Sequence, residues 1–167
     1  QSIYDNQIVD KILEKLKQSN KCFIEENALW LKTTDYTDDK DRVLIKSDGT
    51  YTYFLPDIAY HANKLSRGYD HLIDVLGSDH HGYIDRLKAA VTMIGGKSDL
   101  IDIEMLQMVR VIENGQELKM SKRSGKAITL MDLIEEVGSD ALRYFYVEKS
   151  LNTHMDLDLT LMKQKSN

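Results

Sequence analysis

The feature that most constrains the fold is a short apolar run that ends in a glycine and leads into a helical segment. Residues 72–76 are apolar apart from Asp74, which predicts a buried strand. Gly77 ends this run, and the pattern that follows predicts a helix reaching about Ile94. Strand, glycine and helix in this order let a nucleotide-binding sheet present a ligand at the carboxyl ends of its strands. The sequence therefore predicts an α/β fold of Rossmann type.

A second feature is the run Lys-Met-Ser-Lys-Arg-Ser-Gly at residues 119–125. Lys119 and Lys122 are compact charges on flexible stems, Ser121 can donate a hydrogen bond between them, and Gly125 lets the backbone turn. Such a loop suits a phosphate group. Taken alone, it is equally compatible with a solvated basic turn.

Composition indicates one ordinary globular domain, because 42% of the 167 residues are hydrophobic and 29% are charged. The net charge of -5 argues against a protein that wraps nucleic acid with its whole surface, so a nucleic-acid contact should be local. The single cysteine, Cys22, excludes an intrachain disulfide and is expected in the core. Neither a long apolar run nor a basic-then-apolar amino terminus is present, so we expect a cytoplasmic protein that does not enter a membrane.

The first third of the chain predicts a helix and then short strands. Apolar residues at helical spacing predict an amphipathic helix over residues 5–18. Further elements are a hairpin of residues 22–24 and 28–31, an exposed polar loop over 33–41, a strand pair of 42–46 and 50–54, and a helix over 57–65 with Pro56 at its start.

The last third predicts one more strand and two helices. The strand lies within residues 101–112 and is clearest over 106–112. Thr129 is expected as the N-cap of a helix that ends at Val137, and another helix is expected over residues 141–149.

Four segments together resemble the arginyl-tRNA synthetase family. The lysine run resembles the KMSK signature of class I aminoacyl-tRNA synthetases. The other three are Ser-Asp-Gly-Thr at 47–50 with Tyr-Phe-Leu-Pro-Asp-Ile-Ala-Tyr-His at 53–61, Gly-Ser-Asp-His-His-Gly-Tyr at 77–83, and Asp-Ala-Leu-Arg at 140–143. They occur in the order of that family, and it is their combination that indicates arginine.

The resemblance implies that Tyr53, Asp57 and His81 bind the arginine substrate. A carboxylate can pair with a guanidinium, and a phenol adds a hydrogen bond or a ring face. Without the resemblance, Asp57 is explained as well by a charge that interacts favourably with a helix start.

The resemblance also implies an ATP site and a catalytic loop. Gly77, Asp79, His80, Met108 and Val109 are expected to bind ATP, with Asp79 on the ribose. The expected catalytic residues, which would stabilise the departing pyrophosphate, are Lys119, Ser121 and Lys122.

ATP is expected as a substrate, and magnesium is expected to accompany it. We expect no metal held by the protein itself. Adjacent His80 and His81 could suggest a metal site, but neighbouring side chains diverge and the one cysteine lies far away in sequence. One of the two histidines is instead expected to face the cleft, and the other to pack or cap the following helix.

The 167 residues contain no His-x-Gly-His element, which class I synthetases use to hold the phosphates. We therefore expect the second half of a Rossmann-type catalytic domain over residues 1–137, with an inserted hairpin region at about 20–54, and a truncated helical lead into the anticodon-binding domain over 138–167. Such a piece should be inactive alone. In the full-length enzyme, expected to be monomeric, the partners would be ATP, arginine and tRNA(Arg).

Two alternatives remain open at this point. One is another class I synthetase such as a cysteinyl-type enzyme, although its zinc site should need several Cys and His ligands. The other is a module that binds a nucleotide or tRNA without catalysis.

Overall fold

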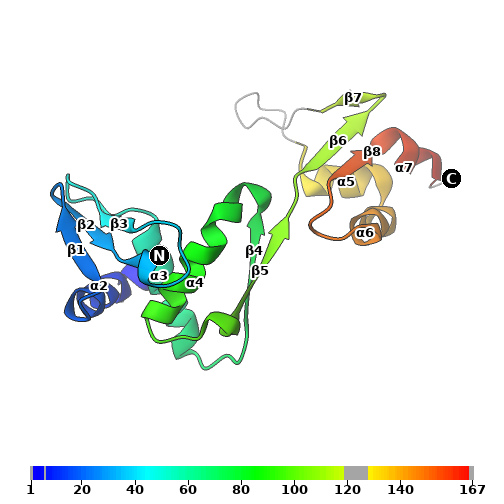
Figure 1. The fold of residues 1–167 in the computed structure, drawn as a ribbon. Helices are drawn as coiled ribbons and strands as arrows, with labels where there is room; N and C mark the ends of the chain where they lie inside the picture. The colour runs from blue at the N-terminus through cyan, green and yellow to red at the C-terminus, as the bar shows by residue number, and fades with distance from the viewer. Residues whose placement is uncertain (1, 6, 119–127, 166–167) are drawn as a thin grey trace. The chain divides into compact units, whose positions relative to one another are not determined.

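The computed structural model describes residues 2–5, 7–118 and 128–165, which form two compact units (Figure 1). Unit 1 comprises Gln1–Val75 and Asp79–Glu104, and unit 2 comprises Leu76–Ser78 and Met105–Asn167. Each unit combines helices with small β-sheets. The predicted mixed α/β class is therefore confirmed.

Unit 1 begins with helices and a three-stranded sheet. Helix α1 (Ser2–Asp5) precedes the amphipathic α2 (Ile8–Gln18), which buries Val9, Leu13 and Leu16. Strands β1 (Cys22–Glu25), β2 (Ala28–Leu31) and β3 (Arg42–Ile45) are antiparallel in that order, and η1 (Thr33–Asp35) lies between β2 and β3. Glu26 and Asn27 both have positive φ, 48° and 60°, which matches the two-residue turns that join twisted strands.

The strand predicted over residues 50–54 is wrong. Only Tyr51 pairs there, in a single bridge to Ile45. The Asp48 carboxylate accepts hydrogen bonds from the backbone and hydroxyl of Thr50, which holds a turn in place of an extended strand. Helix α3 (Phe54–Ser66) then begins at Phe54, so Pro56 lies within its first turn, where a missing N–H costs no hydrogen bond.

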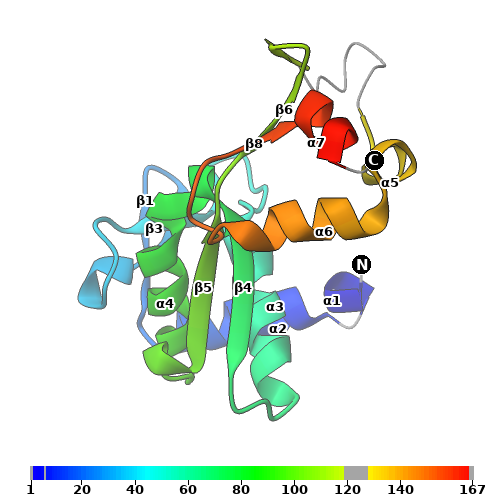
Figure 2. The same ribbon diagram turned by 90° about the vertical axis from the view of Figure 1, so that its right-hand side faces the viewer.

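The rest of unit 1 places a helix against two strands. Strand β4 (Leu72–Gly77) is followed by η2 (Ser78–Tyr83), α4 (Ile84–Met93), η3 (Ser98–Leu100) and β5 (Ile101–Leu106), which pairs with β4. Figures 1 and 2 show β4 and β5 side by side. Leu87 and Val91 of α4 pack on Leu72 and Ile101, so α4 covers this strand pair.

Unit 2 has its own sheet and core. Strands β6 (Val109–Glu113), β7 (Gln116–Glu117) and β8 (Met155–Asp158) form a sheet in the order β7-β6-β8, and β6 runs parallel to β8. Helices α5 (Leu130–Val137), α6 (Ser139–Glu148) and α7 (Leu159–Lys165) complete the unit. Its core contains Val111, Leu133, Leu142, Leu157 and Met162.

Two predictions for unit 2 had different outcomes. Thr129 is the N-cap of α5 as predicted, and its hydroxyl accepts a hydrogen bond from Asp132 N at 3.1 Å while the Asp132 carboxylate caps Thr129 N in return. The strand expected within residues 101–112, and most clearly over 106–112, is divided into two strands, because β5 ends at Leu106 and β6 starts at Val109.

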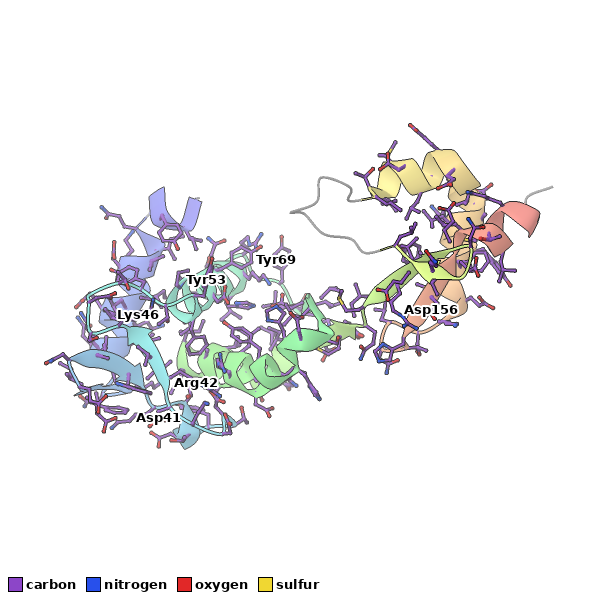
Figure 3. The ribbon with its side chains drawn as sticks, turned by 90° about the horizontal axis from the view of Figure 1, so that it is seen from above. Asp41, Arg42, Lys46, Tyr53, Tyr69 and Asp156 are labelled. Atoms are coloured by element: carbon purple, nitrogen blue, oxygen red, sulfur yellow. The ribbon has the colours of Figure 1, made fainter. Side chains whose placement is uncertain are left out.

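The segment predicted as a helical lead contains a strand as well as helices. Strand β8 lies between α6 and α7 and is joined to β6 by the bidentate pair of Arg110 with Asp156, at 2.8 Å (Asp156 is labelled in Figure 3). Within the described ranges, no helix is both long enough and apolar enough to cross a membrane.

Candidate functional site

The predicted arginine-binding residues Tyr53 and Asp57 lie one turn apart at the start of α3. Asp57 N donates to Tyr53 O at 3.3 Å, so the two residues share the first turn. The Tyr53 side chain is 92% exposed (labelled in Figure 3), whereas Asp57 is half-buried. A carboxylate near a helix N-terminus is favoured by the helix dipole.

The Asp57 carboxylate is held by Tyr83. The Tyr83 hydroxyl donates to Asp57 Oδ2 at 2.5 Å. Burial of the ring and the adjacent carboxylate both raise the pKa of Tyr83 above its ordinary value. The phenol is therefore neutral and remains a hydrogen-bond donor across the working pH range.

Arg86 lies over the ring of Tyr83. Its guanidinium carbon is 5.0 Å from the Tyr83 ring centre and 5.9 Å from that of Phe54. Its Nε is buried without a hydrogen-bond partner among the described residues and lies 3.9 Å from Asp38 Oδ2. The Arg86 side chain is therefore stacked on aromatic rings.

The loop predicted over residues 33–41 is mostly exposed, but Asp38 within it is buried, at 8% exposure. Arg42 Nε and a terminal nitrogen of its guanidinium donate to the two Asp38 oxygens at 2.7 and 2.6 Å (Arg42 is labelled in Figure 3). Burial alone would raise the pKa of Asp38, but the hydrogen bonds and charge of Arg42 outweigh it and lower the pKa to about 2. The loop is therefore anchored through an ion pair.

A second polar network lies further along α3. His61 Nδ1 donates to the carbonyl oxygen of Asp57 at 2.8 Å, and its Nε2 lies 2.7 Å from Asp74 Oδ2. Lys64 pairs with the other oxygen of Asp74. The hydrogen bond from His61, followed by that from Lys64, lowers the pKa of Asp74 to about 2. This network joins α3 to β4 beside the Asp57 backbone.

The predicted residues of the Gly-Ser-Asp-His-His-Gly-Tyr segment are exposed. Asp79, His80 and His81 all face solvent. His80 Nε2 lies 3.8 Å from Asp79 Oδ2, and the His80 ring meets the ring of Tyr83 edge to face at 6.4 Å. The His80 ring thus contacts Tyr83, the residue that precedes α4, although both histidine side chains are exposed.

Three of the predicted ATP-binding residues belong to unit 2. Gly77 is the last residue of β4. Met108 lies between β5 and β6 and is 70% exposed, so its side chain is not part of the core. Val109 begins β6 opposite Met155 and packs on the core of unit 2.

The three predicted catalytic residues, Lys119, Ser121 and Lys122, lie outside the residues that the structure describes. In the described part of the chain, no three side chains of the His, Cys, Asp or Glu type come together as metal ligands would.

Unit 2 also contains a groove of about 560 Å³ between α5 and α6. Leu130, Ile134, Leu142 and Val147 line it, together with Arg143 of the Asp-Ala-Leu-Arg segment. Its lining is mainly apolar, which does not suit a charged nucleotide or amino acid.

The sequence did not reveal five residues that shape this site: Asp38, His61, Asp74, Tyr83 and Arg86. One signal was available, because Asp74 is the only charged residue within an otherwise apolar strand, and a buried charge needs a partner. Tyr83 was part of a recognised segment, but nothing in its spacing indicated that it would reach Asp57.

Comparison with known proteins identifies the family of this chain. Residues 1–159 match the family model described as tRNA synthetases class I (R), catalytic domain. The chain is 54% identical over 166 residues to proteins named arginine–tRNA ligase from Bacillus subtilis and Listeria welshimeri. The matches cover 99% of this chain but only 30% of each relative.

Solved structures give the same result. A structure from Campylobacter jejuni described as an arginyl-tRNA synthetase has a TM-score of 0.84 and 41% identity, and the match covers 95% of this chain and 34% of that one. Thermus thermophilus arginyl-tRNA synthetase shares the fold, with a TM-score of 0.78 at 17% identity over 96% of this chain and 37% of its own. The resemblance found in the sequence is thus confirmed, and the chain belongs to the family of class I (R) tRNA synthetase catalytic domains.

Proposed function

We propose that this chain is the arginine- and ATP-binding part of an arginine–tRNA ligase, an enzyme that activates arginine with ATP and transfers it to tRNA(Arg). The observation that carries the proposal is the Asp57 carboxylate, which is half-buried at the start of α3 and is oriented by Tyr83. A carboxylate held in this way is suited to pair with a guanidinium. The sequence identity to named ligases supports arginine over the cysteinyl-type alternative.

Within this proposal, residues 1–137 are the second half of a Rossmann-type catalytic domain with an inserted hairpin region at about 20–54. Residues 138–167 lead into the anticodon-binding domain. The succession of β4, α4 and the paired β5 supports the Rossmann assignment, because it places Gly77 at the carboxyl end of a strand. The intact enzyme is proposed to be a cytoplasmic monomer.

The substrate residues have separate roles in this proposal. Tyr53, Asp57 and His81 bind arginine. Asp79 accepts hydrogen bonds from the ribose of ATP, while Gly77 and His80 lie beside the nucleotide. Met108 and Val109 offer backbone groups to adenine. Exposure of Tyr53, Asp79 and His81 supports these roles, since each side chain is available to a ligand.

The reaction is proposed to have two steps. The arginine carboxylate attacks the α-phosphate of ATP, the bond to the β-phosphate breaks, and pyrophosphate leaves from an arginyl-adenylate. A hydroxyl of the terminal tRNA ribose then attacks the arginyl carbonyl, and AMP leaves. Positioning and charge neutralisation dominate the first step, with Lys119, Ser121 and Lys122 on the departing phosphates. Magnesium enters with ATP and keeps most of its ligands from phosphate and water.

A chimaeric enzyme tests this proposal. This chain replaces the matching segment of the Bacillus subtilis arginine–tRNA ligase, and ATP–pyrophosphate exchange is measured with tRNA(Arg) present. We expect exchange that depends on arginine. The 167 residues alone should show none, because they contain no His-x-Gly-His element.

The outcomes separate the alternatives. Exchange that depends on cysteine would favour the cysteinyl-type enzyme. A folded chimaera that binds ATP but supports no exchange would favour a module without catalysis. Appreciable exchange by the isolated 167 residues would contradict their assignment as half of a phosphate site.

A further inference from the structure

We infer that Tyr83 is a positioning residue for the arginine site, which fixes the orientation of the Asp57 carboxylate through its hydroxyl. The inference rests on the proposed function, in which Asp57 binds the substrate guanidinium. It assigns to Tyr83 a part in substrate specificity, although the residue lies 26 positions from Asp57 in the chain.

The hydrogen bond from Tyr83 occupies one oxygen of the Asp57 carboxylate and leaves the other available to a ligand. Tyr83 donates to Oδ2 at 2.5 Å. Within the described part of the chain, this is the side-chain hydrogen bond that the carboxylate accepts, so Oδ1 is left for a ligand. A carboxylate fixed at one oxygen loses its rotational freedom before the substrate arrives, which lowers the entropic cost of binding.

The ring of Tyr83 is itself held on two sides. Phe54 meets it edge to face, with ring centres 6.1 Å apart and planes at 80°. Arg86 lies over the ring at 5.0 Å. The phenol therefore has little freedom to turn its hydroxyl away from Asp57.

The support extends into the loop that precedes β3. Asp38 lies 3.9 Å from Arg86 Nε and is itself fixed by Arg42. The hydroxyl of Thr37 donates to the carbonyl oxygen of Asp85 at 3.0 Å, which ties the same loop to the first turn of α4. Contacts thus run from Arg42 through Asp38, Arg86 and Tyr83 to Asp57, all within unit 1.

The chemical state of Tyr83 suits this role. Its raised pKa keeps the phenol protonated, so it donates to the carboxylate and does not compete with it for the substrate cation. A simpler interpretation is that Tyr83 only packs in the core, to which it also contributes. The two interpretations differ in what the hydroxyl alone does.

Tyr83→Phe isolates the hydroxyl, because the substitution keeps the ring and its contacts with Phe54 and Arg86. In the chimaeric ligase, we expect the KM for arginine to rise about tenfold, the magnitude typical for loss of a hydrogen bond to a charged group. The kcat and the KM for ATP should stay within about twofold, and the melting temperature should change little.

Tyr51→Phe is the matched control. Tyr51 also donates its hydroxyl to an aspartate, Asp10 at 3.0 Å, on the exposed surface of unit 1. Both variants remove a tyrosine hydroxyl that donates to an aspartate, so a general effect of losing such a hydrogen bond would also appear in Tyr51→Phe. We expect the control to leave both KM values unchanged.

A double substitution shows whether Tyr83 acts through Asp57. Asp57→Asn should raise the KM for arginine. Adding Tyr83→Phe to that variant should change the KM by less than about twofold, because the carboxylate that Tyr83 orients is already absent. A full tenfold effect of Tyr83→Phe in the Asp57→Asn background would contradict the inference. So would an equal rise of the KM for arginine and for ATP.

Failure of this inference is distinguishable from failure of the proposed function. If Asp57→Asn leaves the KM for arginine unchanged, the proposed arginine site is wrong. If Asp57→Asn raises it and Tyr83→Phe does not, only the role of Tyr83 is wrong. Should Tyr83→Phe fail to fold, Arg86→Lys provides the second variant. It weakens the stack on the Tyr83 ring and should raise the KM for arginine about threefold. An unchanged KM for arginine in that variant would contradict the inference.

Discussion

Nε2 of His61 on α3 lies 2.7 Å from Oδ2 of Asp74 on β4, and the side chains are only 6% and 11% exposed. Lys64 pairs with the second oxygen of the same carboxylate. Nδ1 of His61 lies 2.8 Å from the carbonyl oxygen of Asp57, so each ring nitrogen faces an oxygen that can only accept a hydrogen bond. This cluster therefore holds the helix that carries Asp57 against the strand that leads to the predicted ATP site.

Replacement of Asp74 should destabilise unit 1. Asp74→Asn removes the negative charge between His61 and Lys64, and we expect a loss of about 2 kcal/mol in the free energy of unfolding. Trp30, the single tryptophan, lies in β2 of unit 1, so its fluorescence during urea unfolding reports on this unit.

Asp102→Asn is the control for that measurement. Asp102 pairs with His71 at 3.0 Å, but the side chains are 60% and 48% exposed. An exposed pair of this kind contributes little. Equal destabilisation by the two variants would contradict the structural role given to Asp74.

The stabilisation by Asp74 should depend on pH. The pKa of Asp74 is about 2 in the folded protein against 3.8 for an ordinary aspartate. A lowered carboxyl pKa stabilises the fold fully above about pH 4 and loses this effect as the pH falls toward 2. The difference in unfolding free energy between the wild type and Asp74→Asn should therefore shrink over that interval, and a difference that grew toward low pH would exclude this origin.

The buried pair of Asp38 and Arg42 gives a second stability prediction. Asp38→Ala leaves Arg42 without its buried partner and should cost about 3 kcal/mol in the unfolding free energy. Asp39 also contacts Arg42, but its side chain is 77% exposed. Asp39→Ala should therefore change stability by less than about 0.5 kcal/mol, by the same Trp30 measurement. Similar values for the two variants would mean that burial does not decide the strength of the pair.

These networks show where prediction from the sequence succeeded and where it failed. The start of α5 was predictable because its cap is local, with Thr129 and Asp132 three positions apart. The pairing of β8 with β6 was not predictable, because Arg110 and Asp156 are 46 positions apart and an apolar pattern does not indicate which strand pairs with which. Asp38 stands in an acidic run that resembles any exposed loop, and only the folded position of Arg42 accounts for its burial.

The candidate site shows the same limit. Tyr53 and Asp57 could be named because they fall in a recognised segment and lie one helical turn apart. The hydrogen bond from Tyr83 joins two recognised segments across 26 positions, so it required the fold. The contact of Arg86 with Phe54 depends on the relative placement of α3 and α4, which no local pattern specifies.

The lysine run yields a prediction about catalysis. Lys122→Ala in the chimaeric ligase should lower kcat by about a hundredfold to a thousandfold with little change in the KM for ATP, because its contact with the departing pyrophosphate forms chiefly in the transition state. Pre-steady-state rates of adenylate formation over a range of ATP concentrations measure both quantities. A raised KM with an unchanged kcat would indicate a ground-state phosphate contact, and no change at all would indicate a solvated turn.

The most direct test of the arginine site is the effect of Asp57→Asn on the two substrates of the chimaeric ligase. Steady-state exchange is measured over a range of arginine at saturating ATP, and over a range of ATP at saturating arginine. Loss of the carboxylate that pairs with the guanidinium should cost about 2 to 5 kcal/mol in arginine binding, which is a rise of at least about thirtyfold in its KM. The KM for ATP should change by less than about threefold, and Tyr53→Phe should have a smaller effect on arginine than Asp57→Asn. Equal changes for arginine and ATP, or an unchanged KM for arginine, would contradict the assignment of Asp57 to the substrate guanidinium.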